Sequence, residues 1–317
     1  MSKQVIWLIL GRLGAAVLTL LIVSAVVFIA TDMLPGDTAQ ILLGQAATPQ
    51  AVAGLRKAMH LNDPAIFRYL RWLGGLLVGN LGHSYASNLP VSTLIGSRIG
   101  NSLELAGITT LVSVPLALSL GILAAIQPGS RFDRFVTVLS VGVISVPEFM
   151  VANLAVLFFA VYLHWLPALS FVSQIHSPID FVRVYAMPVF TLTCVISAQM
   201  VRMTRAAMVE TMSAPYIEMA MLKGASRRRL VLYHALPNAV GPIANAVALS
   251  LSYLLGGVII VETVFNYPGL AKLMVDGVET RDLPLIQSCA MIFCLGFLLL
   301  VTIADIIAIL SNPRLRK

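Results

Sequence analysis

Residues 239–261 form the stretch AVGPIANAVALSLSYLLGGVIIV, which carries no charged side chain. A helix needs about 20 apolar residues to cross the hydrocarbon core of a bilayer, and this stretch is long enough to do so. The sequence contains five further apolar runs of comparable length, at residues 13–31, 105–127, 135–163, 184–201 and 285–309. We therefore expect an all-α integral membrane protein with about six transmembrane helices.

The composition excludes an ordinary soluble domain. Of the 317 residues, 58% are hydrophobic and 11% are charged, and the mean hydropathy is +0.91. A net charge of +7 could suit a nucleic-acid-binding protein, but the basic residues flank the apolar runs instead of clustering on an aqueous face. The three cysteines lie inside apolar stretches and the five histidines are scattered, so we predict no metal site and no cofactor bound by this chain.

The distribution of basic residues predicts the orientation of the spans. Residues 23–25 resemble a signal-peptide cleavage site, but the apolar run continues past them, which favours an uncleaved first helix. Placing both termini in the cytoplasm puts 13 of the 21 basic residues on that side, as the positive-inside rule requires. These residues are Lys3, Arg12, Arg131, Arg134, Arg202, Arg205, Lys223, Arg227, Arg228, Arg229, Arg314, Arg316 and Lys317.

The segment after the first span, residues 32–101, is too polar for the membrane and has helix signals of its own. Thr48-Pro49 and Asp63-Pro64 each combine an N-cap residue with a proline suited to a first helical turn. We expect two short helices over the outer mouth of the protein. The alternative, a solvated spacer, would leave three aromatic side chains in water: Phe67, Tyr69 and Trp72.

A second short helix-forming stretch, SAPYIEMAMLKG, occupies residues 213–224 between the fourth and fifth spans. Ser213 is a candidate N-cap, Pro215 suits the first turn, and Gly224 permits a left-handed end after Lys223. A helix of about ten residues reaches only about 15 Å, which is half the thickness of the hydrocarbon core. This helix therefore cannot be a span.

The same helix is nearly all apolar. A stripe at helical spacing contains Tyr216, Ile217, Ala220 and Met221, and Met219 and Leu222 extend it around the side. Such a surface should lie in a groove, either on the membrane bundle of this chain or on another protein. The residues alone leave both possibilities open.

This stretch resembles a known family. Residues 218–224, EMAMLKG, are followed after nine residues by HALP at 234–237. The pattern is similar to the E-A-A-x3-G-x9-I-x-L-P loop of permeases from binding-protein-dependent ABC importers, although Met219 and His234 depart from it. The fuller run HALPNA, residues 234–239, is similar to the dipeptide, oligopeptide and nickel branch of that family.

Other elements of the branch occur in the same order along the chain. Three residues in them differ from the common pattern of the branch: Asn80 stands in place of Asp, Thr38 in place of Pro, and Tyr267 in place of Trp. The matching stretches are MLPGD at 33–37, GNLG at 79–82, SLELA at 102–106, VRMTR at 201–205, ETVFNYPGL at 262–270 and NPRLR at 312–316.

The resemblance implies the permease fold of a type I ABC importer. Residues 1–101 would form the first transmembrane helix and an extracytoplasmic helical segment, and residues 102–317 a five-helix core with a cytoplasmic coupling loop at about 204–238. The implied partners are a second homologous permease, two cytosolic ATPases that bind ATP and Mg²⁺, an extracytoplasmic substrate-binding protein and membrane lipid, with no nucleic acid. The implied location is the bacterial inner membrane, and the implied role is transport of peptides or similar small solutes.

Within this family the short cytosolic helix is the coupling helix that docks on an ATPase. The residues expected to form that contact are Tyr216, Ile217, Glu218, Ala220, Met221, Lys223 and Gly224. Arg227, Arg228 and Arg229 could also contact the ATPase, but basic residues at this position are typical anchors to anionic lipid.

Two further regions are candidate sites. Glu148 lies near the middle of the third span, directly after Pro147, and a carboxylate at that depth usually faces protein or water. It could line the pathway and meet a cationic substrate group, or serve as a buried structural partner. Tyr267, Pro268 and Gly269 are candidates for the outer gate or for contact with the binding protein, whereas Glu104 and Asp305 are expected to be structural.

A secondary transporter or channel of six helices is the alternative function. It would predict broken helices and an inverted repeat, and the two halves of the sequence show no convincing repeat. No nucleotide-binding or hydrolase motif occurs, so we expect a transport subunit and no enzyme. Within the importer interpretation, the substrate could also be a nickel complex, an opine, glutathione or an oligosaccharide.

Overall fold

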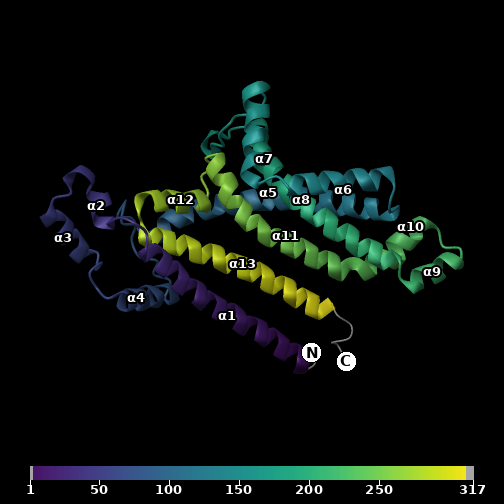
Figure 1. The fold of residues 1–317 in the computed structure, drawn as a ribbon, viewed down its shortest axis with the longest axis horizontal. Coiled ribbons are helices and arrows are strands. Elements are labelled where there is room, and N and C mark those ends of the chain that lie inside the picture. Colours follow the sequence, from purple (N-terminus) through teal and green to yellow (C-terminus); the bar gives the residue numbers. More distant parts are fainter. Residues whose placement is uncertain (1–2, 312–317) are drawn as a thin grey trace. The chain divides into compact units, whose positions relative to one another are not determined.

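The structure, a computed structural model, describes residues 3–311, and its regular elements are helices (Figure 1). The α-helices are α1 (Lys3–Asp32), α2 (Thr38–Leu43), α3 (Pro49–Ala58), α4 (Ala65–Leu77), α5 (Val91–Ile126), α6 (Arg131–Ile144), α7 (Glu148–Ala155), α8 (Pro178–Met212), α9 (Pro215–Leu222), α10 (Arg227–Arg229), α11 (Leu236–Val264), α12 (Leu270–Thr280) and α13 (Leu283–Ser311). Two π-helices, η2 (Val156–Tyr162) and η4 (Leu230–Ala235), and two 3₁₀ turns, η1 (Gly44–Ala46) and η3 (Val172–Gln174), complete the set. The NPRLR stretch at 312–316 lies outside the described residues.

Among the described residues, five helices are long and apolar enough to cross a membrane, and a bent pair would make a sixth. The five comprise α1, α5, α8, α13 and a continuous rod from Arg227 to Val264 that joins α10, η4 and α11. The all-α membrane architecture is therefore confirmed. Several helices are longer than their apolar runs, such as α8 with 35 residues.

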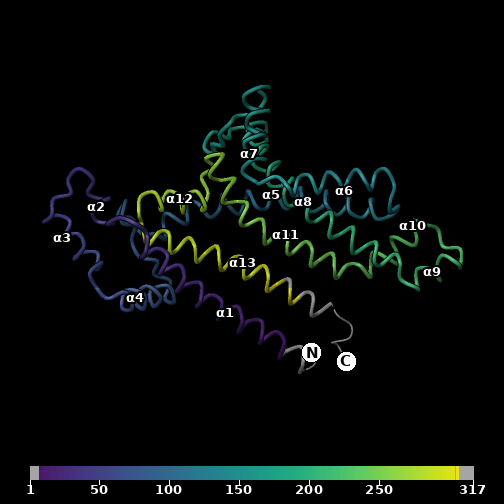
Figure 2. Tube along the Cα trace, in the orientation of Figure 1, coloured from purple at the N-terminus to yellow at the C-terminus, as the bar shows by residue number. Residues whose placement is uncertain are grey.

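The third expected span is not one helix. The chain bends by 100° between α6 and the α7–η2 segment. Pro147 is extended, with ψ 143°, and it has no N–H to continue the helical ladder of α6, so its carbonyl starts a new helix by accepting from Met150 and Val151. The expected location of Glu148 near the middle of a continuous span is wrong, since Glu148 is the first residue of α7. Figure 2 shows this change of direction along the chain.

The chain groups into two compact units. The first contains residues 104–267 and the ends of α1 and α13, up to residue 13 and from residue 299. The second contains residues 14–103 and 268–298. The structure thus groups residues 268–298 with the amino-terminal segment, whereas the sequence suggested a single division after residue 101.

In the first unit, α8 is the central helix. In the most apolar part of α8, 72% of the residues are buried. The helix packs along α6, α7 and α11. Gly121 of α5 allows a close approach to α8, because a Cβ on Gly121 would lie 2.8 Å from the Cβ of Thr204. Small residues permit such close packing between membrane helices.

In the second unit, buried polar contacts attach the segment at residues 32–101 to the spans. The Gln287 amide of α13 donates to the hydroxyl of Thr31 in α1 over 2.7 Å. Asp282, at the start of α13, is fully buried, and its carboxylate accepts from the hydroxyl of Ser84 and from the backbone N–H of Tyr85. The short break between α12 and α13 therefore holds a loop in place.

The segment at residues 32–101 contains short helices, as expected, with some differences in detail. Thr48 caps α3 by accepting from the N–H of Ala51 over 3.2 Å. Asp63 does not cap α4; Pro64 takes that place, and Asp63 accepts instead from Arg71 over 3.1 Å. The sequence analysis missed α2, which Asp37 caps. The solvated-spacer alternative is wrong for Tyr69 and Trp72, which pack on Phe28, although Phe67 is exposed.

Candidate functional site

The short helix α9 is the first part of the candidate site. It spans eight residues, about 12 Å, so it is too short to cross a membrane. Pro215 occupies its first turn, but Ser213 does not cap it: Ala214 is the N-cap residue and makes no side-chain bond. The Ser213 hydroxyl donates instead to the carbonyls of Val209 and Glu210 and so completes the last turn of α8.

The carboxyl end of α9 has the two hydrogen bonds of a Schellman motif. The N–H of Gly224 donates to the carbonyl of Met221 over 2.9 Å, and the N–H of Ala225 donates to the carbonyl of Ala220 over 3.2 Å. Gly224 has φ +82°, which a side chain disfavours, although a Cβ there would meet no atom within 4 Å. The glycine is therefore required for its backbone conformation and not for space.

The two faces of α9 have different environments. Ile217 is 1% exposed and packs in the core of the first unit with Met208 of α8 and with Leu230 and Val231 of η4, and Ala220 is partly buried beside it. The expected apolar stripe is therefore divided: Ile217 and Ala220 face the bundle, and the other apolar side chains face outward. The exposed side chains of α9 are Pro215, Tyr216, Glu218, Met219, Met221 and Leu222.

A continuous helical rod connects this region to the membrane. After α9, the chain turns at Gly224 and enters the rod from Arg227 to Val264. Arg227, Arg228 and Arg229 are exposed at its start, and α9 packs against η4 a turn later. The helix α9 is therefore in direct contact with the first part of the rod.

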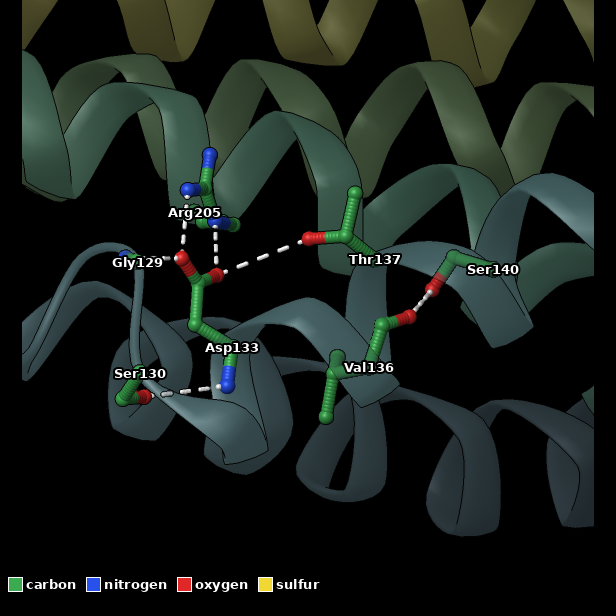
Figure 3. A network of polar contacts seen from close by, with 7 residues as sticks. All are labelled: Gly129, Ser130, Asp133, Val136, Thr137, Ser140 and Arg205. Carbon is green, nitrogen blue, oxygen red and sulfur yellow. Dashed lines mark hydrogen bonds and ion pairs between the residues drawn. The ribbon is translucent and has the colours of Figure 1, made fainter.

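A buried ion pair holds α6 to α8 near this end of the bundle (Figure 3). Asp133, in the first turn of α6, is 2% exposed, and both of its carboxylate oxygens accept from the guanidinium of Arg205 in α8. The N–H of Gly129 also donates to this carboxylate, over 2.7 Å, and the N–H of Asp133 donates to the Ser130 hydroxyl. From the sequence, Arg205 was expected only as a cytoplasmic charge, and Asp133 was not a candidate. The pairing was not predictable, because nothing in the sequence relates residues 72 positions apart.

Glu148 projects from the start of α7 toward α11. A Cβ built on Gly257 would lie 3.1 Å from a carboxylate oxygen of Glu148 and 3.1 Å from the Cδ2 of Leu192. Gly257 therefore leaves the space that Glu148 occupies, in the angle between α7, α8 and α11. Glu148 is half-buried, so a charged or hydrogen-bonding group could reach it from one side.

Tyr267, predicted at the outer gate, is fully buried in the first unit. Its hydroxyl lies 3.0 Å from that of Tyr185 in α8, and their rings meet edge to face. Burial raises the pKa of Tyr267, and its hydrogen bond with Tyr185 and the nearby Glu104 and Glu262 carboxylates raise it further. A neutral tyrosine pair therefore joins α8 to the end of α11. Tyr267 has no surface in this conformation that a binding protein could contact.

Pro268 and Gly269, the other two gate candidates, lie in the second unit. The carbonyl of Pro268 accepts from the side-chain amide of Asn101 over 2.8 Å. Gly269 is the N-cap residue of α12, and the N–H of the next residue, Leu270, donates to the hydroxyl of Ser102 over 2.8 Å. These bonds attach the start of α12 to α5.

Asp305, which we expected to be structural, forms an ion pair in the first unit. Its carboxylate lies 3.3 Å from the guanidinium of Arg12. The pair joins the amino-terminal end of α1 to the carboxyl-terminal part of α13, which fits a structural role.

Comparison with known proteins covers nearly the whole chain. Residues 117–317 match the family described as binding-protein-dependent transport system inner membrane component, and residues 5–106 match the amino-terminal part of the same kind of membrane component. A probable peptide ABC transporter permease protein of Sinorhizobium fredii is 33% identical over 308 residues, which is 97% of this chain and 98% of that protein. Glutathione transport system permease proteins of Escherichia coli are 35% (strain K12) and 36% (strain CFT073) identical over the same shares of both chains.

These matches set aside the alternative of a secondary transporter or channel. Systems of this family depend on a binding protein and on ATPase subunits, and the membrane component is a transport subunit with several spans in the inner membrane. The chain therefore belongs to the inner membrane components of binding-protein-dependent transport systems, as a permease subunit of an ABC importer.

Proposed function

We propose that this permease receives the movement of a cytosolic ATPase through the exposed face of α9. The observation that carries the proposal is the division of α9 into a buried and an exposed side: Ile217 is held in the bundle, whereas Leu222 is 76% exposed. An apolar surface outside the membrane needs a partner. A groove on the ATPase that accepts Tyr216, Met221 and Leu222 would supply one.

The residues predicted for coupling divide into two roles under this proposal. Tyr216, Glu218, Met221 and Lys223 would touch the ATPase, since they are exposed. Ile217 and Ala220 would fasten α9 to its own bundle, and Gly224 would fix the turn that leads to the rod. Movement of α9 would then displace the rod, because α9 packs directly on η4.

The Asp133–Arg205 pair has a place in this mechanism. Arg205 lies about two helical turns before the end of α8, which leads into α9. A charge-assisted, bidentate contact resists separation of the helices that it joins. We infer that it makes α6 and α8 move together when α9 is displaced.

The complete importer would contain this chain, a second homologous permease, two ATPases that bind ATP and Mg²⁺, and an extracytoplasmic binding protein. The family description and the role of α9 support this composition. The pathway would lie between the two permeases, with Glu148 lining it, and the start of α12 at Pro268 and Gly269 would contribute to the outer gate together with the Tyr185–Tyr267 pair. Gate opening would require that pair to separate.

The substrate class that we propose is short peptides, including tripeptides of the size of glutathione. The support comes from the names of the relatives, which are described as transporting peptides or glutathione. A carboxylate at Glu148 would suit the protonated amino group that peptides carry. A nickel complex, an opine or an oligosaccharide would need a different binding protein, so calorimetric titration of the associated binding protein with each class tests the substrate directly.

The docking proposal can be tested at Leu222. Replacement of Leu222 by Glu places a charge in the proposed ATPase groove, while Leu222→Met keeps the side chain apolar and of similar volume. Copurification of the ATPases and ATP-dependent uptake should fall sharply with Glu and stay near wild type with Met. Equal copurification and uptake in all three proteins would contradict docking through this face.

A further inference from the structure

The extracytoplasmic helix α4 has an apolar face that its own chain does not cover. Ile66, Phe67, Leu70 and Leu77 are exposed, and Leu70 is 55% exposed. At 100° per residue, Ile66, Leu70 and Leu77 lie within a narrow arc and Phe67 borders it, so they form one continuous surface. The neighbouring helix α3 differs: within residues 49–58 no large hydrophobic side chain is exposed.

The opposite face of α4 is attached to the membrane-spanning helix α1. Tyr69 and Trp72 pack on the ring of Phe28, at centroid distances of 5.4 and 6.2 Å. The hydroxyl of Tyr69 lies 2.9 Å from the hydroxyl of Ser24. This second face fixes the position of α4 along the span.

The contacts with α1 set the depth of α4 in the bilayer. Arg68 pairs with Asp32, at the end of α1, over 2.6 Å, whereas Tyr69 reaches Ser24. Ser24 lies about 12 Å deeper than Asp32 at a rise of 1.5 Å per residue. The helix α4 therefore lies beside the last turns of the span, at the level where headgroups meet acyl chains.

The charged edge of α4 faces a cavity that both polar and apolar side chains line. Arg68 and Arg71 lie side by side between the two apolar faces and line a cavity of about 840 Å³. The other polar side chains that line it are His60, Asn80, His83, Ser84, Tyr85, Asn88 and Gln287. One edge of α4 thus carries charge, while the face with Leu70 is apolar.

We propose that α4 is an interfacial helix whose exposed apolar face is embedded in the outer leaflet of the membrane. The apolar outer surface of α1, a candidate span, includes the exposed side chains of Val26 and Ile29 and extends beside α4 along the same stretch of the helix. Interfacial helices bury an apolar face among the acyl chains near the headgroups and keep cationic side chains at the polar boundary. The lipid surface is therefore the partner of this face, and α4 anchors the extracytoplasmic segment to the bilayer.

A nitroxide label reports the depth of this face. The complete transporter is reconstituted in lipid vesicles with Leu70→Cys or with the control Ala53→Cys on the exposed side of α3, in a chain whose three native cysteines are replaced and whose uptake is retained. Collisions of the label with oxygen, which partitions into lipid, and with a water-soluble nickel chelate are then compared. We expect the oxygen-to-nickel ratio to be several-fold higher at residue 70 than at residue 53, with or without the binding protein.

A second measurement uses the native cysteines unchanged. A photoreactive phenylalanine analogue at residue 70 should form adducts with phospholipid. A ratio at residue 70 equal to that at residue 53, or adducts with the binding protein in place of lipid, would overturn the proposal.

Discussion

The helices α4 and α9 are both short, and both bury one face against their own unit while exposing apolar side chains on the other. They differ in what the buried face touches. Tyr69 of α4 contacts Ser24, deep in the span of α1, whereas Ile217 of α9 contacts η4 at the start of a membrane rod. The exposed face of α4 therefore lies beside the last turns of α1, whereas α9 packs against the first turns of the rod.

This comparison shows that exposed apolar area alone does not identify a partner. Leu77 is 81% exposed and Leu222 is 76% exposed, so the two residues would be equivalent in a list of surface residues. The two residues are distinguished by the depth at which the buried face of each helix is attached, because lipid surrounds the protein at one depth and water at the other. Changes at α9 should consequently impair coupling, and changes at α4 should alter only membrane contact.

The largest expected effect is at Gly224. Valine at φ +82° is strained by about 1–2 kcal/mol. In Gly224→Val, the equilibrium constant that favours the native position of α9 should therefore fall by about tenfold. The matched control is Gly224→Asn, because asparagine tolerates the left-handed region. In the assembled transporter, uptake per ATP hydrolysed should fall with Val and persist with Asn. Equal uptake per ATP hydrolysed by both variants would contradict the role assigned to the left-handed turn at Gly224.

The second expected effect is at the ion pair between α6 and α8. Asp133→Asn removes the charge that accepts from Arg205, and a charge-assisted hydrogen bond contributes about 1.5–3 kcal/mol, toward the lower end here because Arg205 is 29% exposed. The thermal midpoint of unfolding in detergent should fall.

Arg205→Ala should lower that midpoint similarly, and the double variant should cost less than the sum of the two. Additive losses would show that the two residues stabilise the protein independently of each other.

A third, smaller effect is expected at Gly257. The added methyl of Gly257→Ala would lie 3.1 Å from the Glu148 carboxylate, so Glu148 would be displaced from α11. Uptake of cationic peptides should fall in Gly257→Ala and in Glu148→Gln, while uptake of peptides with a blocked amino group should change less. The neighbouring Gly256→Ala is the control, since a Cβ there meets no atom within 4 Å. An equal loss for both peptide classes would contradict the proposal that the charge of Glu148 binds the amino group of the peptide.

The smallest effects are expected at the helix caps. Thr48→Ala removes the N-cap bond of α3 and should weaken that helix by about 1 kcal/mol, visible as faster amide exchange over residues 49–58. Ser213→Ala should leave exchange in α9 unchanged, because Ser213 bonds back to α8. Faster exchange in α9 of the Ser213 variant would instead restore the expected capping role.

The sequence predicted the spans well and their interruptions poorly. An uncharged run such as 239–261 can only be accommodated in lipid, so its helix follows from the cost of burying unpaired backbone groups. Whether Pro147 kinks a helix or ends it depends on the side chains that receive the next segment, and these come from α8 and α11. Local sequence contains no information about that packing.

The site was predictable where it depends on backbone chemistry. Gly224 is required by a left-handed turn and Pro215 by a first helical turn, and both follow from single residue types. The contacts of Asp133 and Asp282 were not predictable, because their partners, Arg205 and Ser84, lie far away along the chain. The stripe on α9 was found, but its division between bundle and exterior depends on η4, which the sequence could not place.

The most direct test of the account is a photoreactive phenylalanine analogue placed at Leu222 of α9 in the assembled transporter, with the same analogue at Leu77 of α4 for comparison. We predict that the label at residue 222 forms an adduct with an ATPase subunit, whereas the label at residue 77 forms adducts with phospholipid. Adducts of residue 222 with lipid or with this chain alone, in a transporter that still hydrolyses ATP and imports substrate, would contradict the assignment of α9 as the contact with the ATPase.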